Sequence, residues 1–415
     1  MPRSGVLMSV NLLAAFTLIT TAAFPYRMWL PIGPFPSFSI LDVALIVSAL
    51  YLSACLLLQG AIKLGDAPSF TLLLVPLLAT LLSSAWSQDL LATLRSTTLY
   101  IEAIIAYLTV INLLKQYSAR TILRLVSWFV IALVLAGAFL LLNVPGFQPQ
   151  SPALKEEFGD YIPYYARLSH PFLGRSNNLA TVLAFFVPVF AAAGQAVRKR
   201  RYLFMAIITL VATILTFSRG VLIALLVVGL IYGVGSARSF LGTLRFLALS
   251  LVPIGLSVLI MVTYNDATRV TLGDRLSDTN ITSRLDLLEI GLEKIASRPL
   301  LGYGGGVNPD NEEALKPTVH NTFVQQVIYF GIPLGFAVGM SLVLLMVRFF
   351  VWRGAGAESR VIARAVGFSV LGQLLIFFAE SSFEGATLRI LFYLSLGLSI
   401  SLLEAPSTSK ARYYE

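Results

Sequence analysis

Twelve apolar stretches of near membrane-spanning length recur along the chain and constrain its fold more than any other feature. A helix needs roughly 20 apolar residues to cross the hydrocarbon core of a bilayer. Inside that core the helix pairs its own backbone polar groups, which lipid cannot do. The sequence therefore predicts an all-α, polytopic integral membrane protein with about twelve transmembrane helices. The stretches are 6–24, 38–59, 70–86, 97–113, 121–142, 177–195, 202–217, 220–235, 246–264, 322–347, 364–382 and 388–404.

Composition supports this class and excludes others. Of the 415 residues, 57% are hydrophobic and 12% are charged, whereas a soluble domain carries about 25% charged residues. A soluble enzyme, a disordered chain, a coiled coil and a disulfide scaffold are thereby excluded. One cysteine, Cys55, and two histidines argue against a disulfide and a zinc site, and we expect no metal and no cofactor.

The loops differ in charge, which predicts the orientation. Short basic loops, such as 198–201, alternate with longer ones and hold most of the Lys and Arg residues. By the positive-inside rule these basic loops and both termini face the cytoplasm. The Lys and Arg residues of these cytoplasmic loops also explain the net charge of +9, so the charge does not require a nucleic-acid partner. The loops 143–176 and 265–321 then lie outside, as a cap on a single membrane domain spanning 1–415.

The loop 265–321 contains a predicted amphipathic helix over 281–295. Its apolar residues recur at helical spacing, Ser283 and Asp286 fit a capping box at its start, and Pro299 follows its end. We expect this helix to lie along the outer membrane surface with its apolar face down. Arg284 falls in its first turn, where it is either a solvated charge or part of a site.

Arg219 connects two short apolar stretches, 202–217 and 220–235. Helices of about 16 residues rise only ~24 Å, less than the ~30 Å hydrocarbon core. Their shared outer tip should therefore dip below the surface and take Arg219 with it. A cation at that depth is costly unless it faces a polar cavity, so Arg219 is either a snorkelling side chain or an anion-binding group.

Both histidines lie in the predicted outer loops. His320 precedes the stretch beginning at Asn321, where a helix N-terminus would keep its imidazole neutral and able to accept a proton. The alternative is a capping or interfacial role. His170 precedes Pro171, which is typical of a turn, although Arg175 is near it in the sequence. The glycines at 331, 335 and 339 predict close helix packing.

Taken in order, these segments resemble the O-antigen ligase and polymerase superfamily of bacterial glycan-transferring membrane proteins. Residues 216–225 resemble its Ser-Arg-Gly helix start, and Arg284 with 296–305 resembles its outer helix and Pro-Leu-Leu-Gly-x-Gly turn. His320 and Asn321, nine residues and then Gly331 resemble the ligase signature. Residues 174–180 are similar to the segment that enters the family's sixth helix. One departure is Leu334, since a small or hydroxyl residue is expected there and Gly335 follows one position later.

The resemblance implies the substrates and the residue roles. The donor is a glycan on undecaprenyl diphosphate at the outer leaflet of a bacterial inner membrane. The acceptor is lipid A–core oligosaccharide for a ligase, or a second lipid-linked glycan for a polymerase. Arg219 and Arg284 would bind the diphosphate, with Arg175 and Arg275 in reserve, and His320 would be the base. A lipid-linked glycan transporter is the alternative from another class, and Asn321 and His170 complete the substrate-binding candidates.

Overall fold

The computed structural model describes residues 2–23, 27–28, 38–141, 168–170, 173, 176–216, 218–236, 279–307, 319, 321–352, 356–379 and 386–405. Helices account for nearly all of this structure. Within these ranges, the one strand pairing joins β1 (Arg27–Met28) and β2 (Phe38–Ser39) in an antiparallel ladder. The helices are α1 (Pro2–Ala23), α2 (Ile40–Gln59), α3 (Ala67–Ser83), α4 (Leu90–Leu114), α5 (Ala119–Leu141), α7 (Ser176–Ala196), α8 (Arg200–Leu215), α9 (Arg219–Ser236), α12 (Thr279–Ser297), α13 (Thr322–Phe350), α14 (Ala357–Ala379) and α15 (Ala386–Leu403).

Eleven of the twelve predicted apolar stretches coincide with helices, and the stretch 246–264 lies outside the described residues. Among the described residues, six helices are long and apolar enough to cross a membrane, and four shorter apolar segments accompany them. This architecture is that of a polytopic helical membrane protein. The six are α2, α4, α5, α7, α13 and α14.

The centre of the bundle is the contact between α4 and α15. Tyr107 and Tyr393 are fully buried there. A Cβ at Gly397 would lie 3.1 Å from the Tyr107 carbonyl oxygen, so glycine allows the two backbones to approach. The Tyr393 hydroxyl donates to the Leu73 carbonyl of α3 at 2.7 Å. Burial of this phenol is thus compensated by a hydrogen bond, as an interior without water requires.

The helix α13 is broken at Gly331, whose backbone has φ 75° and ψ 170°. A left-handed φ of this kind is accessible to glycine and strained for other residues. The break divides α13 into a half-helix, residues 322–330, and a longer second part, residues 332–350. The apolar pattern predicted one continuous span over 322–347, and this prediction is wrong.

The half-helix folds back along the second part of α13. A Cβ at Gly335 would lie 2.7 Å from the Cα of Val327, and one at Gly339 would lie 3.2 Å from the ring of Phe323. In a straight helix residues eight apart are about 12 Å apart. Contacts between residues eight and sixteen apart therefore require an antiparallel hairpin with Gly331 at its tip. Close helix packing at Gly335 and Gly339 was predicted, and it is observed between the two parts of α13.

A short glycine-rich turn, residues 299–306, crosses the break in α13. The Ile332 N–H donates to the Pro299 carbonyl at 2.7 Å, and the Tyr303 N–H donates to the Ile328 carbonyl at 3.0 Å. The Gly304 N–H donates to the Tyr329 carbonyl at 2.9 Å. A broken helix leaves carbonyl and N–H groups without intrahelical partners, and this turn supplies partners for three of them.

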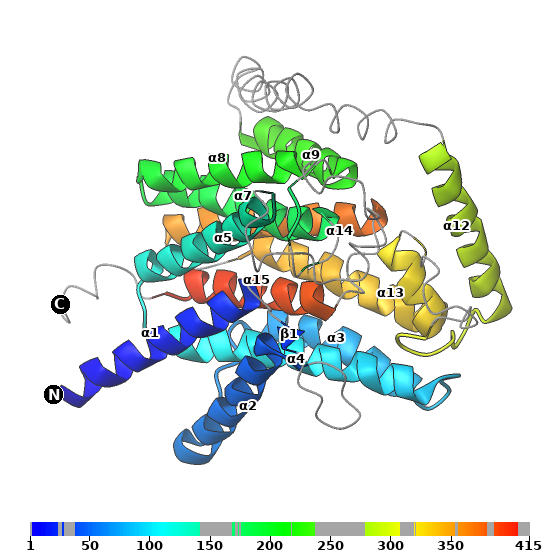
Figure 1. Cartoon of the computed structure of the whole chain (residues 1–415), viewed down its shortest axis with the longest axis horizontal. Coiled ribbons are helices and arrows are strands. Elements are labelled where there is room, and N and C mark those ends of the chain that lie inside the picture. Colours follow the sequence, from blue (N-terminus) through cyan, green and yellow to red (C-terminus); the bar gives the residue numbers. More distant parts are fainter. Residues whose placement is uncertain are drawn as a thin grey trace.

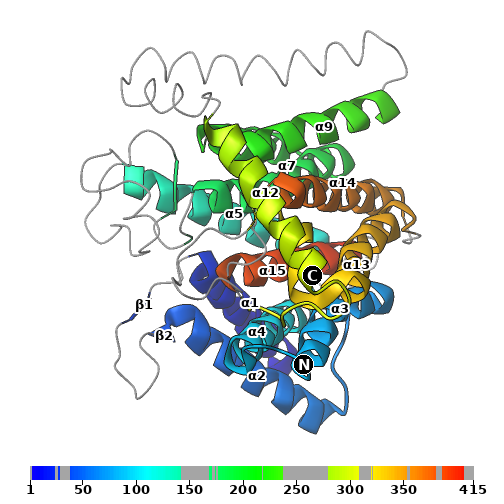
Figure 2. The same ribbon diagram turned by 90° about the vertical axis from the view of Figure 1, so that its right-hand side faces the viewer.

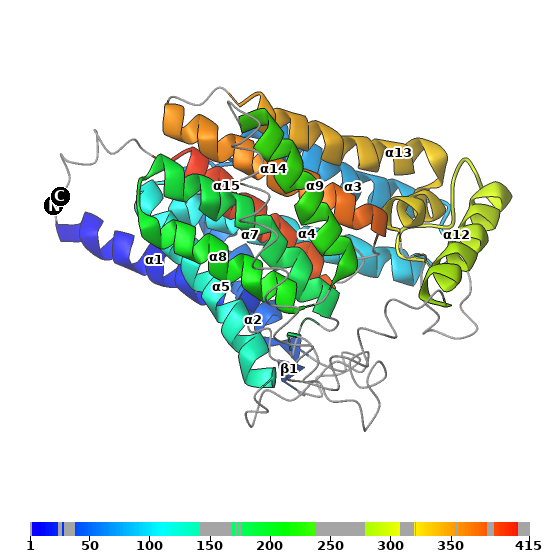
Figure 3. The same cartoon turned by 90° about the horizontal axis from the view of Figure 1, so that it is seen from above.

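The helix α12 lies across one end of the bundle (Figures 1 and 2). The long helices run side by side, with α12 beyond their ends and α13 along one edge (Figure 3). We call this end of the molecule the α12 end. The helix predicted over 281–295 is thus observed. It begins earlier, at Thr279, so Ser283 lies inside the helix and the predicted capping box at its start is wrong. No glycine or proline interrupts 279–283, and the helix extends through them.

Candidate functional site at the α12 end

The N-terminal ends of three helices meet around the last turns of α14. The ring of Phe323, at the start of α13, lies 4.4 Å from that of Phe378 on α14. Ile376 of α14 belongs to one buried cluster with Val221 of α9 and Ala180 of α7. We call this meeting point of α7, α9 and α13 the junction.

The junction has the electrostatic character of an anion site. Each helix N-terminus carries roughly half a positive charge and unpaired backbone N–H groups. Because the half-helix is nine residues long, the junction lies about 13 Å below the tip of α13. An anion bound there would be recessed below the hairpin.

Arg219 is the first residue of α9 and lies at the junction. Its side chain is half-buried and takes part in an interaction with another group. Thr216 and Ser218, in the connection from α8, are both fully buried. The short helices α8 and α9 thus join at a buried position, and Arg219 begins one of the three converging helices. The predicted depth of this position below the membrane surface stays a prediction.

His170 belongs to a short segment that joins distant helices. The Leu168 N–H donates to the carbonyl of Leu215, the last residue of α8, at 2.7 Å. The imidazole of His170 bonds the backbone carbonyl of Ala23, the last residue of α1. The ring is 0% exposed, and this burial lowers its pKa to about 3, with the Ala23 bond acting in the opposite direction. A neutral His170 therefore braces the bundle, and its contact with a substrate stays a prediction.

Asn321 is the N-cap of α13. Its Oδ1 accepts hydrogen bonds from the N–H groups of Phe323 at 3.0 Å and Val324 at 3.1 Å. On its other side, the Asn321 N–H donates to the Val319 carbonyl at 2.7 Å. His320 itself lies outside the described residues, but both of its covalent neighbours are at this helix start.

The helix α12 packs over the start of α13 through Gly291. A Cβ at Gly291 would lie 2.7 Å from Val319 and 3.2 Å from Val324. Position 284 is seven residues, or about two turns, before Gly291, so both fall on the same face of α12. The sequence candidate Arg284 lies in α12 at this distance from Gly291, and its role in a site stays a prediction. Arg175 and Arg275 lie outside the described residues.

Arg389 is a buried cation that the sequence analysis did not single out. It is 4% exposed, in the first turn of α15, with its guanidinium 4.0 Å from the ring centroid of Tyr100. Its Nη1 also donates to the Ser96 carbonyl at 3.3 Å. The sequence did contain a signal for Arg389, since it stands at the second position of the apolar stretch 388–404. Ionisable residues within membrane spans are rare, and each is a candidate functional residue.

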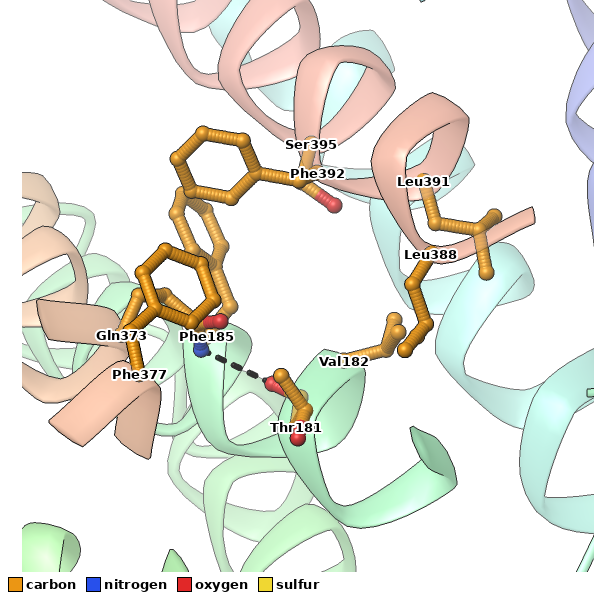
Figure 4. A pocket seen from close by; sticks show the side chains of 9 residues that line it. All are labelled: Thr181, Val182, Phe185, Gln373, Phe377, Leu388, Leu391, Phe392 and Ser395. Carbon is orange, nitrogen blue, oxygen red and sulfur yellow. Dashed lines mark hydrogen bonds between the residues drawn. The ribbon is translucent and has the colours of Figure 1, made fainter. Parts of the chain in front are cut away.

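A narrow pocket lies beside the junction, where α7, α14 and α15 meet (Figure 4). Its wall is aromatic and aliphatic, with Phe185, Phe377 and Phe392 among its side chains. The polar contributions come from Thr181, Gln373 and Ser395, and Gln373 Nε2 donates to the Thr181 carbonyl at 2.9 Å. This hydrogen bond joins α14 to α7 beside the junction.

The fold is that of a polytopic membrane protein, and the N-termini of α7, α9 and α13 meet at the junction. The family model for O-antigen ligase matches residues 204–339. That range contains Arg219, Arg284 and His320 with Asn321. The match covers about a third of the chain and supports an assignment to the O-antigen ligase and polymerase superfamily of membrane enzymes. No curated protein matches the chain.

Proposed function

We propose that the protein is a metal-independent, inverting glycosyltransferase of the O-antigen ligase type. It moves a glycan en bloc from undecaprenyl diphosphate to a sugar hydroxyl of lipid A–core oligosaccharide. The α12 end faces the periplasm, at the outer face of the bacterial inner membrane. The observation that carries the proposal is the convergence of three helix N-termini with Arg219 at the junction.

The junction suits the leaving group of this reaction. When the bond between the anomeric carbon and the phosphate oxygen breaks, negative charge grows on the diphosphate. Arginine binds such oxygens with a two-pronged, always charged group, and fixed dipoles aimed at developing charge lower the barrier. We assign this role to Arg219 and Arg284, assisted by Arg175 and Arg275.

His320 is the proposed general base. The acceptor hydroxyl gives its proton to the imidazole as its oxygen bonds the anomeric carbon, and the electron pair of the breaking C–O bond leaves with undecaprenyl diphosphate. Attack opposite the leaving group inverts the anomeric centre. A helix N-terminus disfavours the imidazolium, so the ring starts neutral and ready to accept a proton.

An apolar groove supports a lipid-borne donor. The groove runs between α7, α8, α9 and α14. Leu222, Leu225 and Leu226 of α9 line it, and Leu222 is one turn from Arg219. A polyprenyl chain lying in this groove would place its diphosphate at the start of α9.

Purified protein in detergent tests the proposal, since detergent removes any membrane gradient. Lipid-linked glycan is supplied with either lipid A–core or a second lipid-linked glycan as acceptor. Product on lipid A–core, lost in His320→Ala, supports the ligase. Product only on the lipid-linked acceptor assigns a polymerase that uses the same chemistry. Absence of product with both acceptors, together with glycan movement across vesicles, would favour a transporter.

A further inference from the structure

We propose that Asn321 and Gly331 are positioning residues that fix where the chain enters the junction. They do so by giving the half-helix 322–330 a defined start and a defined end. The inference rests on the proposed function, because the residue that they would position is the base, His320, which is bonded to Asn321.

The start of the half-helix is set by the side chain of Asn321. Its Oδ1 accepts from two backbone N–H groups, those of Phe323 and Val324, and its backbone is extended, with φ −153° and ψ 110°. This is the geometry of an N-cap, for which Asn and Ser are among the preferred residues. The oxygen of Asn321 is therefore engaged in holding the helix start, and this favours a positioning role over direct binding of substrate.

The end of the half-helix is set by Gly331. Its φ of 75° turns the chain out of the helix, and a Cβ there would overlap the Leu300 carbonyl group. The glycine-rich turn 299–306, which crosses this break, is bonded to the neighbouring elements. The Gly305 N–H donates to Ser83 Oγ of α3 at 3.0 Å, and the Gln88 N–H donates to the Tyr303 carbonyl at 3.0 Å. The tip of the hairpin is thus held by the ends of α3 and α4.

Between these two fixed points the number of residues sets the depth of the chain. Nine helical residues cover about 13 Å, which returns the chain from the tip to the level of Phe378 on α14. Gly335, directly beside Val327, permits this return. The spacing of nine residues between the polar residue and the glycine therefore fixes the distance from the tip of the hairpin to the junction. Gly335, one position after Leu334, supplies the small residue that the hairpin requires.

Cap variants test the role of Asn321. Asn321→Ser keeps an uncharged cap and should retain kcat within about threefold, whereas Asn321→Ala should lower kcat at least tenfold with little change in the KM for donor. The matched control is Ser39→Ala, which removes the capping box of α2. It should lower the melting temperature comparably and leave kcat unchanged. Should Asn321→Ala fail to fold, Asn321→Gly replaces it, because glycine removes the capping oxygen yet is tolerated at N-caps. It should lower kcat in the same way, since a glycine does not fix the helix start.

Equal losses in Asn321→Ser and Asn321→Ala, with a raised KM, would overturn the positioning role and make the amide a substrate contact. Full activity of the Ala or Gly variant would overturn it as well.

Glycine variants test the other fixed point. Gly331→Ala should lower kcat at least tenfold, whereas Gly372→Ala, whose Cβ would meet only Val228 at 3.6 Å, should not. If Gly331→Ala is active while His320→Ala is inactive, the positioning role of Gly331 is refuted, but His320 remains the proposed base. An active His320→Ala refutes the proposed function itself, whatever the other variants do.

Discussion

The guanidinium of Arg348 donates two hydrogen bonds to the carboxylate of Asp66, from Nε to Oδ2 at 3.0 Å and from Nη2 to Oδ1 at 2.6 Å. The pair joins the last turn of α13 to the residue that caps α3, at the end of the bundle opposite α12. Asp66 also accepts from the backbone N–H and the hydroxyl of Ser69. The hairpin of α13 is therefore anchored at both extremities, by the glycine turn at one and by this ion pair at the other.

Asp66→Asn should destabilise the protein without altering its chemistry. An amide can still cap α3 but leaves Arg348 without a charged partner, and a hydrogen bond to a charged group contributes about 1.5–3 kcal/mol. Burial acts to raise the pKa of Asp66, but the Arg348 and Ser69 hydrogen bonds outweigh it, so the pKa is lowered from 3.8. The stabilisation should thus be constant above that value and fade as the pH falls further. Thermal unfolding of both proteins from pH 7 to pH 3 measures it, and an unchanged Asp66→Asn melting temperature at pH 7 contradicts it.

His170 should make the protein less stable as the pH falls below 6.5. Its pKa is lowered from 6.5 to about 3, so between these values the unfolded chain binds a proton that the folded protein does not. Each pH unit in this window should remove up to about 1.4 kcal/mol. His170→Gln can still donate to Ala23 but does not titrate. Its melting temperature should therefore vary less with pH between 6.5 and 5, and a slope equal to that of the wild type would refute the assignment.

Replacement of Arg219 or Arg284 by Ala should reduce transfer about 10²–10³-fold, the usual effect of removing one group that stabilises developing charge. Lysine should restore little activity, because it lacks the planar fork of arginine. Initial rates with purified donor and acceptor measure this. Arg201→Ala, which removes a cation stacked on Tyr202 outside the junction, is the control and should be active. A fully active Arg284→Ala would show that Arg284 has no role in transfer and is a solvated charge.

The activity of the wild type should rise with pH through the range in which histidine loses its proton, near ~6.5 for an ordinary imidazole. His320→Ala should be slower by about 10²–10⁴-fold, the usual contribution of general-base catalysis, while it still binds the lipid diphosphate. The reaction should also continue in EDTA. Inhibition by the chelator would show that arginines alone do not stabilise the leaving group.

Cysteine labelling in intact spheroplasts should place the α12 end outside. The background is Cys55→Ser, which removes the single native thiol. A cysteine at Leu300, which is 71% exposed beside α12, should react with an impermeant maleimide. One at the exposed Glu358, at the start of α14, should not. The reverse pattern would invert the topology and place the junction in the cytoplasm.

The positions of the helices could be predicted from the sequence because the bilayer leaves so few alternatives. Each apolar run of sufficient length had to be a helix, and eleven of them are. The hairpin could not be predicted in this way. Gly331 and Pro333 interrupt an apolar run that hydropathy reads as one span, and the groups that stabilise the break come from Pro299, Tyr303 and Gly304, about 30 residues earlier.

The site was predictable in part. Arg219 and Asn321 do lie at helix starts, where the predicted boundaries of the apolar stretches placed them, but their roles in a site stay predictions. The convergence of α7, α9 and α13 around α14 depends on packing between elements far apart in the chain. Arg389 was missed because a single charge at the edge of an apolar run resembles an interfacial residue until its contact with Tyr100 is seen.

The hairpin of α13 also restricts how the chain can vary in length. Between Asn321 and Gly331 an inserted residue would rotate the helix start by about 100° and shift it by ~1.5 Å. A deletion would do the reverse, and neither change could be absorbed, because both ends of the segment are held. Substitutions within the segment keep its register, but insertions and deletions do not. In this part of the protein the fold constrains the number of residues itself, independently of which side chains occupy the nine positions.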